Sequence, residues 1–252
     1  MDQEKILDIA IKAGTTLLRY GAETYRVEDT ITRICKSYGL ACEAFALPTG
    51  IIVSVEGING VSTICKRIPS RTVDLSRISS VNELSRKIAR ETPEYEEVLR
   101  DLNRISELKS FSNVALITCY ALTAFVYVML FGGSVVDALF VLPIGAILGL
   151  IRLVFSKSSS FPFIEYFVSG FVAGILSWLI TFVTPQINPY VIIIGAVINM
   201  LPGIALTNGI RDLLHGDIVS GLARMGEALM VVAVIAAGTG IGLTLWFIGG
   251  PL

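Results

Sequence analysis

The stretch INMLPGIALTNGIRD, residues 198–212, places polar groups inside an otherwise apolar segment. Hydrocarbon cannot hydrogen-bond such groups, so each is costly there unless protein, ligand or water receives it. The Pro-Gly pair predicts a kinked or unwound helix between Asn199 and Asn208. Carriers present such half-helix ends and freed carbonyls to solutes. The predicted substrate-binding residues are Asn199, Pro202, Gly203, Thr207, Asn208 and Arg211. A proline kink repaired by a neighbouring Ser or Thr, with no ligand, is the alternative.

Charges of both signs follow this segment, and by making and breaking pairs they could gate a path. The predicted gating and coupling residues are Asp212, Asp217, Arg224 and Glu227. An anionic carboxylate would suit Arg211 or Arg224 together with the amide end of a broken helix. The structural alternative is that these residues are solvated or paired at headgroup level, with Arg224 and Glu227, three apart, pairing with each other.

A second polar cluster lies near the amino terminus, in the sequence GAETYRVED. It forms a candidate site in the soluble part, made of Glu23, Arg26, Glu28 and Asp29. Paired carboxylates can act as acid and base, but acidic residues at a helix start are also favoured by the helix dipole, and this pattern favours the capping role. The same dipole accounts for Asp137 and Glu165 at the first turns of two apolar segments. His215, the only histidine, is expected at the surface rather than as a proton carrier.

No motif points to catalysis. The chain contains no GxxxxGK[ST], GxSxG, HExxH or EF-hand pattern. No catalytic residue, metal site or cofactor is therefore predicted, and the chain is not expected to be an enzyme.

The composition indicates a membrane protein with a separate soluble part. Hydrophobic residues make up 53% of the 252 positions and charged residues only 16%, with a mean hydropathy of +0.71. The first 110 residues carry 16 of the 20 Lys and Arg and 16 of the 21 Asp and Glu. This balance offers no basic patch, so nucleic acid is not an expected partner. We predict a soluble domain at 1–110 and a transmembrane domain at 111–252.

Hydrophobic periodicity predicts an α+β fold for residues 1–110. The predicted helices span 4–20, 22–38, 76–91 and 93–109. Three short runs rich in branched and aromatic residues, separated by Pro-Thr-Gly and Gly-Ile-Asn-Gly, predict a meander of strands at 40–47, 51–56 and 61–68. Asp74 or Ser76 is expected to cap the third helix, and Pro93 to open the fourth.

Beyond residue 110, five segments are near the roughly 20 residues needed to cross a bilayer. These predicted spans are 111–131, 135–155, 163–183, 190–210 and 225–248. The connections at 132–134 and 184–189 contain no Lys or Arg, whereas the run into the first span and the other two connections are basic. Those basic residues are Arg100, Arg104, Lys109, Arg152, Lys157, Arg211 and Arg224. This asymmetry predicts the amino terminus inside and the carboxyl terminus outside.

Three stretches resemble a known family. They are GAETYRVEDTITRICKSYGL, FALPTGIIVSV and LPGIALTNGIRDLLHGDIVSGLARMGEAL, and they occur in this order. Together they resemble the threonine/serine exporter family over essentially the whole chain, with landmarks that are specific only in combination. The resemblance implies a cytosolic amino-terminal domain followed by helices in the bacterial inner (plasma) membrane.

The resemblance also implies partners. Full-length family members are similar to this chain plus a second block of about five spans. The chain thus resembles the amino-terminal half of a split, two-component form, similar to the larger subunit of a bacterial succinate exporter pair. The odd span count fits a small membrane protein of about five spans that supplies the second half. The other expected partners are the lipid bilayer, further copies of this chain, and a small-molecule substrate.

The leading hypothesis is a subunit of a secondary transporter that exports threonine/serine or a C4 dicarboxylate such as succinate, driven by the proton or charge gradient. One alternative is a regulatory subunit whose soluble domain senses a cytosolic metabolite. Another is a membrane-anchored hydrolase, which the absence of histidine from residues 1–110 argues against.

Overall fold

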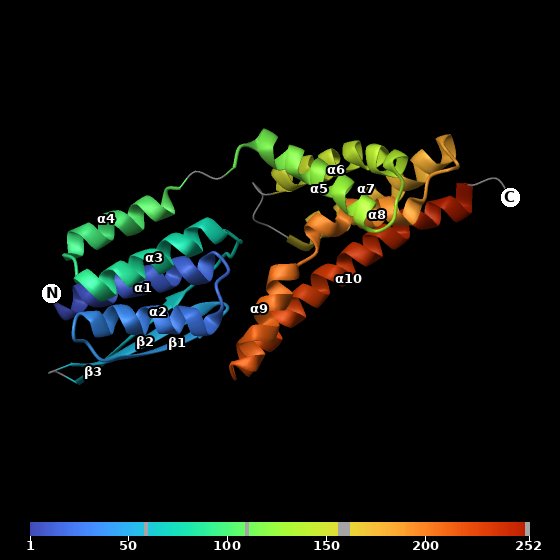
Figure 1. Cartoon of the computed structure of the whole chain (residues 1–252). Coiled ribbons are helices and arrows are strands. Elements are labelled where there is room, and N and C mark those ends of the chain that lie inside the picture. The colour runs from blue at the N-terminus through green and yellow to red at the C-terminus, as the bar shows by residue number, and fades with distance from the viewer. Residues whose placement is uncertain (58–59, 109–110, 156–161, 250–252) are drawn as a thin grey trace. The chain divides into compact units, whose positions relative to one another are not determined.

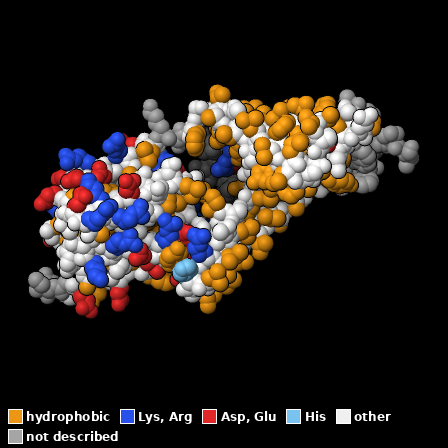
Figure 2. Space-filling model, viewed as in Figure 1, with side chains coloured by type: hydrophobic (Ala, Val, Ile, Leu, Met, Phe, Trp, Pro, Cys, Tyr) orange, Lys and Arg blue, Asp and Glu red, His pale blue; other side chains and the backbone are white. Residues whose placement is uncertain are grey.

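The computed structural model describes residues 1–57, 60–108, 111–155 and 162–249, and these form two compact units (Figure 1). Unit 1 comprises Met1–Lys109 and Gly203–Gly226, and unit 2 comprises Ser110–Pro202 and Glu227–Leu252. Two basic residues that support the predicted topology, Lys109 and Lys157, lie outside the described residues. Figure 2 shows charged side chains gathered over unit 1 and hydrophobic side chains over the helices of unit 2.

The first 109 residues supply four helices and a three-stranded sheet to unit 1. These elements are α1 (Gln3–Arg19), α2 (Thr24–Ser37), β1 (Cys42–Leu47), β2 (Gly50–Gly57), β3 (Gly60–Arg67), α3 (Leu75–Glu91) and α4 (Tyr95–Ser106). Each predicted helix and strand has a counterpart within a few residues. The role predicted for Pro93 is wrong, because Glu94 occupies the N-cap position and α4 begins after it.

The strands form the predicted meander, an antiparallel sheet in the order β1–β2–β3, with Phe45 opposite Ile52 and Ile52 opposite Cys65. One face packs against α1 and α2, where Ile51 and Val53 are buried. Gly14 of α1 makes this close packing possible, since a Cβ there would clash with the side chain of Ile31. β3 is an edge strand of this sheet, and each of its residues is exposed.

Local signals determine where these helices start and stop. Gly21 and Gly39 follow α1 and α2 with φ angles of 91° and 74°, which a glycine adopts without a steric penalty. Asp74 caps α3 as expected, because its carboxylate accepts a hydrogen bond from the backbone N–H of Arg77 at 3.0 Å.

Unit 1 also includes a helical pair from the far end of the chain. This pair consists of α9 (Gly203–Leu214) and the beginning of α10 (Ile218–Gly249), up to Gly226. We expected residues 203–210 in the fourth span and residues 211–224 in a connection. In the structure this stretch folds with the sheet and its helices.

Unit 2 is a helical bundle. Its elements are α5 (Asn113–Leu130), α6 (Val135–Phe155), α7 (Pro162–Val183), α8 (Pro189–Val197), the 3₁₀ turn η1 (Ile198–Met200) and α10 from Glu227 onward. Among the described residues, four helices are long and apolar enough to cross a membrane, or five if the interrupted pair 189–200 and 203–214 is one span. The predicted helix break is present: η1 ends at Met200 and α9 begins at Gly203.

Glycines let the helices of unit 2 approach closely. A Cβ on Gly145 of α6 would lie 2.8 Å from the backbone oxygen of Tyr120 in α5. On α7 and α10, Gly170, Gly174, Gly238 and Gly242 form two small-xxx-small pairs that meet backbone to backbone. In membrane bundles such residues replace the hydrophobic driving force with direct packing.

Asp137 has the structural role that its position predicts. Its carboxylate accepts hydrogen bonds from the N–H and hydroxyl of Ser134, and the hydroxyl of Ser134 accepts from the N–H of Asp137. This reciprocal capping box begins α6. A third hydrogen bond, from the N–H of Asn188 at 3.1 Å, ties α6 to the start of α8.

Candidate functional site

The turn between α1 and α2 is bound by side chains from α9 and α10, all within unit 1. Asp212 of α9 is fully buried, and it accepts hydrogen bonds from the backbone N–H and the hydroxyl of Thr24, both at 3.0 Å. Thr24 is the first residue of α2, whose amino-terminal N–H groups have no partner within the helix. Asp212 therefore caps α2 from a position 188 residues further along the chain.

Arg224 of α10 completes this buried cluster. Its Nε lies 3.0 Å from Oδ2 of Asp212 in an ion pair whose side chains are 6% and 0% exposed. Its Nη2 donates to the carbonyl of Ala22 at 2.8 Å. Asn208 of α9 donates to the carbonyl of Gly21, also at 2.8 Å. The turn is thus held by both helices through backbone groups as well as side chains.

Glu23 joins the two predicted clusters directly. Its carboxylate pairs with Arg26 at 2.9 Å and with Arg211 of α9, and its side chain is 6% exposed. Burial raises the pKa of Glu23, but its backbone N–H, Arg26 and Arg211 together outweigh burial and lower it. The ion pairs of Glu23 with Arg26 and Arg211 stabilise the fold at pH values above the ordinary glutamate pKa. That stabilisation is lost as the pH falls through the lowered pKa of Glu23.

For Glu23 the expected capping role is wrong. Glu23 occupies the N-cap position of α2, but its side chain makes no capping hydrogen bond. Its oxygens are engaged by arginines instead, and the cap comes from Asp212. Asp29 faces away from this cluster and pairs with Arg33 at an exposed position on α2.

Glu28 and Asp217 bring further acidic groups to the same side of α2. Glu28 accepts a hydrogen bond from the N–H of Ala46 at 2.7 Å, which ties α2 to β1. Burial raises the pKa of Glu28, the Ala46 N–H opposes this, and the charges of Asp217 and Asp212 raise it further. Burial and Asp212 likewise raise the pKa of Asp217, with His215 opposing them.

The raised pKa of Glu28 gives a first prediction. A folded-state pKa above the unfolded value means that stability is lost as pH rises through the folded pKa. Glu28→Gln keeps an oxygen for Ala46 and removes the charge, so its stability relative to wild type should increase as pH rises above the ordinary value of 4.5. Urea unfolding between pH 4 and 8 measures this, with labelling of the buried thiol of Cys35 as the signal in a chain whose other cysteines are serine.

The control for this prediction is Glu43→Gln, which removes the same charge from an exposed position on β1. If the difference in unfolding free energy between Glu28→Gln and wild type stays constant from pH 4 to pH 8, burial does not penalise the Glu28 charge.

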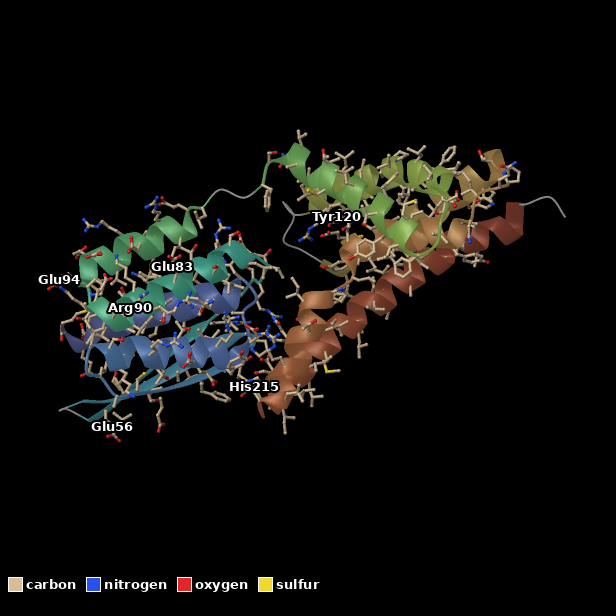
Figure 3. The ribbon with its side chains drawn as sticks, viewed as in Figure 1. Glu56, Glu83, Arg90, Glu94, Tyr120 and His215 are labelled. Carbon is tan, nitrogen blue, oxygen red and sulfur yellow. The ribbon has the colours of Figure 1, made fainter. Side chains whose placement is uncertain are left out.

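His215 lies at the end of α9 and is exposed, as its sequence context predicts (Figure 3). Its ring stacks on Tyr25 of α2 with centroids 4.1 Å apart and an interplanar angle of 2°. Its Nδ1 lies 2.9 Å from the carbonyl oxygen of Arg211. The stack adds a fourth contact between α9 and the start of α2.

The remaining predicted site residues do not join this cluster. Asn199 belongs to unit 2, where it donates to the carbonyl of Tyr120 at 3.2 Å. Thr207 bonds within its own helix, to the carbonyl of Gly203. Pro202 and Gly203 lie at the break itself, and Glu227 is exposed on α10 in unit 2. Asn199 and Asn208 thus each donate a hydrogen bond to protein, Asn199 within unit 2 and Asn208 within unit 1.

Sequence reasoning missed two groups. One is Thr24, whose position at the start of α2 was a signal for an incoming carboxylate. The other is a contact in unit 2 between Arg152 and Glu165, for which the ends of two adjoining spans were the only signal. Among the described residues, no group of three His, Cys, Asp or Glu is placed to hold a metal ion.

Several helices of unit 2 are long and apolar enough to cross a membrane, as in a multi-pass membrane protein. The chain belongs to the threonine/serine exporter family: the family model described as "Putative threonine/serine exporter" matches residues 8–246. Membership supports a transport function and argues against an enzyme.

Curated relatives agree with this assignment. The chain is 22% identical to the "Probable succinate transporter subunit YjjP" of Klebsiella aerogenes, over 99% of this chain and 97% of that protein. It is 21% identical to the protein of the same name from Escherichia coli, over 98% of this chain and 97% of the relative. It is 22% identical to a "Probable threonine/serine exporter" of Mycobacterium tuberculosis, over 95% of this chain but 46% of that protein. No solved structure matches.

Proposed function

We propose that this chain is one subunit of a secondary transporter that exports small polar carboxylates, either threonine/serine or a C4 dicarboxylate such as succinate. The observation that carries this proposal is the helix break at residues 201–202, followed by a helix whose polar side chains bind the α1–α2 turn. Broken helices serve carriers because they expose backbone groups at bilayer depth. Both substrates are named among the relatives.

Under this proposal the amino-terminal domain is cytoplasmic, and the protein sits in the bacterial inner membrane with its carboxyl terminus outside. The support is the positive-inside rule. Arg152, Arg211 and Arg224 fall on the side of Arg100 and Arg104, whereas the loops at 132–134 and 184–189 have no basic residue. α9 and α10 expose apolar residues such as Leu214 and Leu222, which suits contact with lipid.

The cluster around Asp212 would act as the inner gate. Asp212 and Arg224 form a buried ion pair, so opening the gate must expose both to water or to a solute. The candidate gate comprises Glu23, Asn208, Arg211, Asp212, Asp217 and Arg224. The M. tuberculosis relative is about twice as long as this chain, and the two YjjP relatives are called subunits. We therefore expect a small membrane protein of about five spans to complete the carrier.

Transport in a defined system tests the proposal. The full chain is reconstituted with this partner in proteoliposomes loaded with labelled L-serine or succinate. These proteoliposomes should release one of the two solutes faster than protein-free vesicles do. A matched pair of variants then tests the gate: Arg211→Gln should change the rate, and Arg33→Gln, whose pair with Asp29 lies outside the cluster, should not. Release of neither solute above the vesicle background would contradict the proposal.

A second candidate role is regulation by the soluble domain. The outward face of β1 and β2 has a groove of about 410 Å³ lined by Glu43, Ala44, Phe45, Ile52 and Ser54. A metabolite bound there could control the carrier. Phe45→Glu would place a charge in the groove, so loss of concentration control with an unchanged maximal rate would favour sensing by this domain.

A further inference from the structure

The ion pair between Arg152 and Glu165 joins two apolar helices of unit 2. Arg152 lies in the last turn of α6, Glu165 in the first turn of α7, and Nη1 of Arg152 is 2.8 Å from both carboxylate oxygens. The arginine side chain is 38% exposed, whereas the glutamate side chain is 5% exposed. Ionisable residues in membrane segments are costly and commonly mark solute pathways.

Helix dipoles favour these charges at these two helix ends, but the dipoles do not use up the groups' hydrogen-bonding capacity. A guanidinium carries five N–H donors, and a carboxylate has about four acceptor positions. Among the described residues, the hydrogen bonds of Arg152 involve only Nη1. Toward the part of the chain that the structure describes, its Nε and Nη2 therefore retain three donors, and Glu165 retains acceptor positions, while the pair stays intact.

Other polar groups of unit 2 converge on this pair. The phenols of Tyr120 in α5 and Tyr166 in α7 lie within electrostatic range of both charges. Gly149, one turn before Arg152, lets the side chain of Tyr120 lie against α6, since a Cβ there would be 3.3 Å from that of Tyr120. Asn199, beside the helix break, donates to the carbonyl of Tyr120. Phenols from α5 and α7 thus lie near the pair, and the helix break is linked to it through Tyr120.

A separate observation comes from Ser169. It lies one turn after Glu165 on the same face of α7, is fully buried, and its hydroxyl has no hydrogen-bond partner among the described residues. A buried polar atom without a partner needs an explanation, and an absent ligand is one. The hydroxyl would supply a further donor or acceptor beside the pair.

We propose that this cluster is the solute site and that it recognises a zwitterionic α-amino acid. Nε and Nη2 of Arg152 bind the solute carboxylate, and Glu165 accepts from the solute ammonium group. Ser169 and the two tyrosines hydrogen-bond a polar side chain. The pair and the zwitterion each have zero net charge, so binding leaves no uncompensated charge. A dicarboxylate would satisfy Arg152 but would bring its second charge towards Glu165.

This inference rests on the proposed function, and it chooses between the two substrate classes left open there. In the proposed orientation the pair lies at the cytoplasmic ends of α6 and α7, the side from which an exporter is loaded. An unbroken pair also needs no separate rearrangement before a solute binds.

Competition between solutes tests the site. In proteoliposomes of the full chain with its partner, Arg152→Lys should raise the half-saturating concentration of L-serine at least tenfold, because lysine cannot bind a carboxylate in the bidentate manner. Glu165→Gln should shift the preference between L-serine and succinate at least tenfold towards succinate. The control is Asp137→Asn, which neutralises a buried acid at the start of a neighbouring span and should leave that preference unchanged.

A purely structural pair predicts different results. Both substitutions would then lower stability and the rate for each solute equally, and the exchange Arg152→Glu with Glu165→Arg would restore both. Unchanged preference in Glu165→Gln, or restoration of wild-type half-saturation by the exchange, would overturn the proposal. If Arg152→Lys fails to assemble, Glu165→Gln alone still decides.

Ligand-induced thermal stabilisation of the purified full chain separates this proposal from the proposed function. L-Serine should raise the Tm of the wild type and not that of Arg152→Lys, and serinol, which lacks the carboxylate, should have no effect. If vesicles release neither solute but this stabilisation is present, transport fails while the site stands. If transport occurs without any dependence on Arg152, the site fails while transport stands. If the vesicles release neither solute and L-serine does not raise the Tm, the site is overturned as well.

Discussion

Replacing Asp212 by asparagine is expected to lower the free energy of unfolding of unit 1 by about 3–5 kcal/mol, the usual cost of removing one partner from a buried ion pair. The amide keeps the size of the side chain but removes the buried carboxylate charge that pairs with Arg224. It also presents one carbonyl oxygen where the N–H and hydroxyl of Thr24 now have two acceptors. Urea unfolding followed by labelling of Cys35 measures the loss.

Asp29→Asn is the matched control for Asp212→Asn. It removes an aspartate from an exposed pair with Arg33, so it should cost well under about 1 kcal/mol. A double-mutant cycle with Arg224→Met sharpens the test, because the two losses should be strongly non-additive. Simple additivity would mean that Asp212 and Arg224 do not depend on each other.

The second large effect concerns packing between α7 and α10 in unit 2. A Cβ added at Gly238 would fall against the carbonyl oxygen of Phe167, far inside van der Waals contact, and 3.1 Å from the backbone nitrogen of Phe171. Backbone atoms cannot rotate away as a side chain can, so Gly238→Ala should cost about 2–3 kcal/mol by overpacking. Thermal unfolding followed by tryptophan fluorescence reports this, because both tryptophans of the chain, Trp178 and Trp246, belong to unit 2.

Gly240 supplies the control on the same helix. A Cβ there would meet no atom within 4 Å among the described residues, and alanine favours a helix over glycine by up to about 1 kcal/mol. Gly240→Ala should therefore be neutral or stabilising, opposite in sign to Gly238→Ala. Equal effects of both changes would mean that helix propensity, rather than contact with α7, decides the outcome.

Much of the fold follows from local patterns in the sequence. The span at 135–155 has the bounds expected from hydropathy, because a capping box begins it and the apolar run ends in Phe155. The helix break falls at Pro202, inside the predicted interval, because a proline there removes a donor and blocks a turn. The strands of unit 1 follow from branched residues separated by turn signals.

The contacts that make the candidate site could not be obtained in this way. Asp212 and Thr24 are 188 residues apart, and no local pattern pairs them. The capping rule gave the nearer carboxylate, Glu23, because it considers only neighbours in the chain. A more useful signal was the spacing of Asn208 and Asp212, four residues apart on one helix, which indicates a polar face that needs a protein partner.

The buried cap on α2 also has a consequence for biosynthesis. The carbonyls of Gly21 and Ala22 and the N–H of Thr24 receive their partners from residues 208, 224 and 212. A ribosome adding about 5–20 residues per second needs on the order of ten seconds to pass from residue 109 to residue 224. During that interval the nascent soluble part displays an uncapped helix start, which chaperones or proteases can engage. Completion of unit 1 must therefore wait until residues 111–202 have been synthesised.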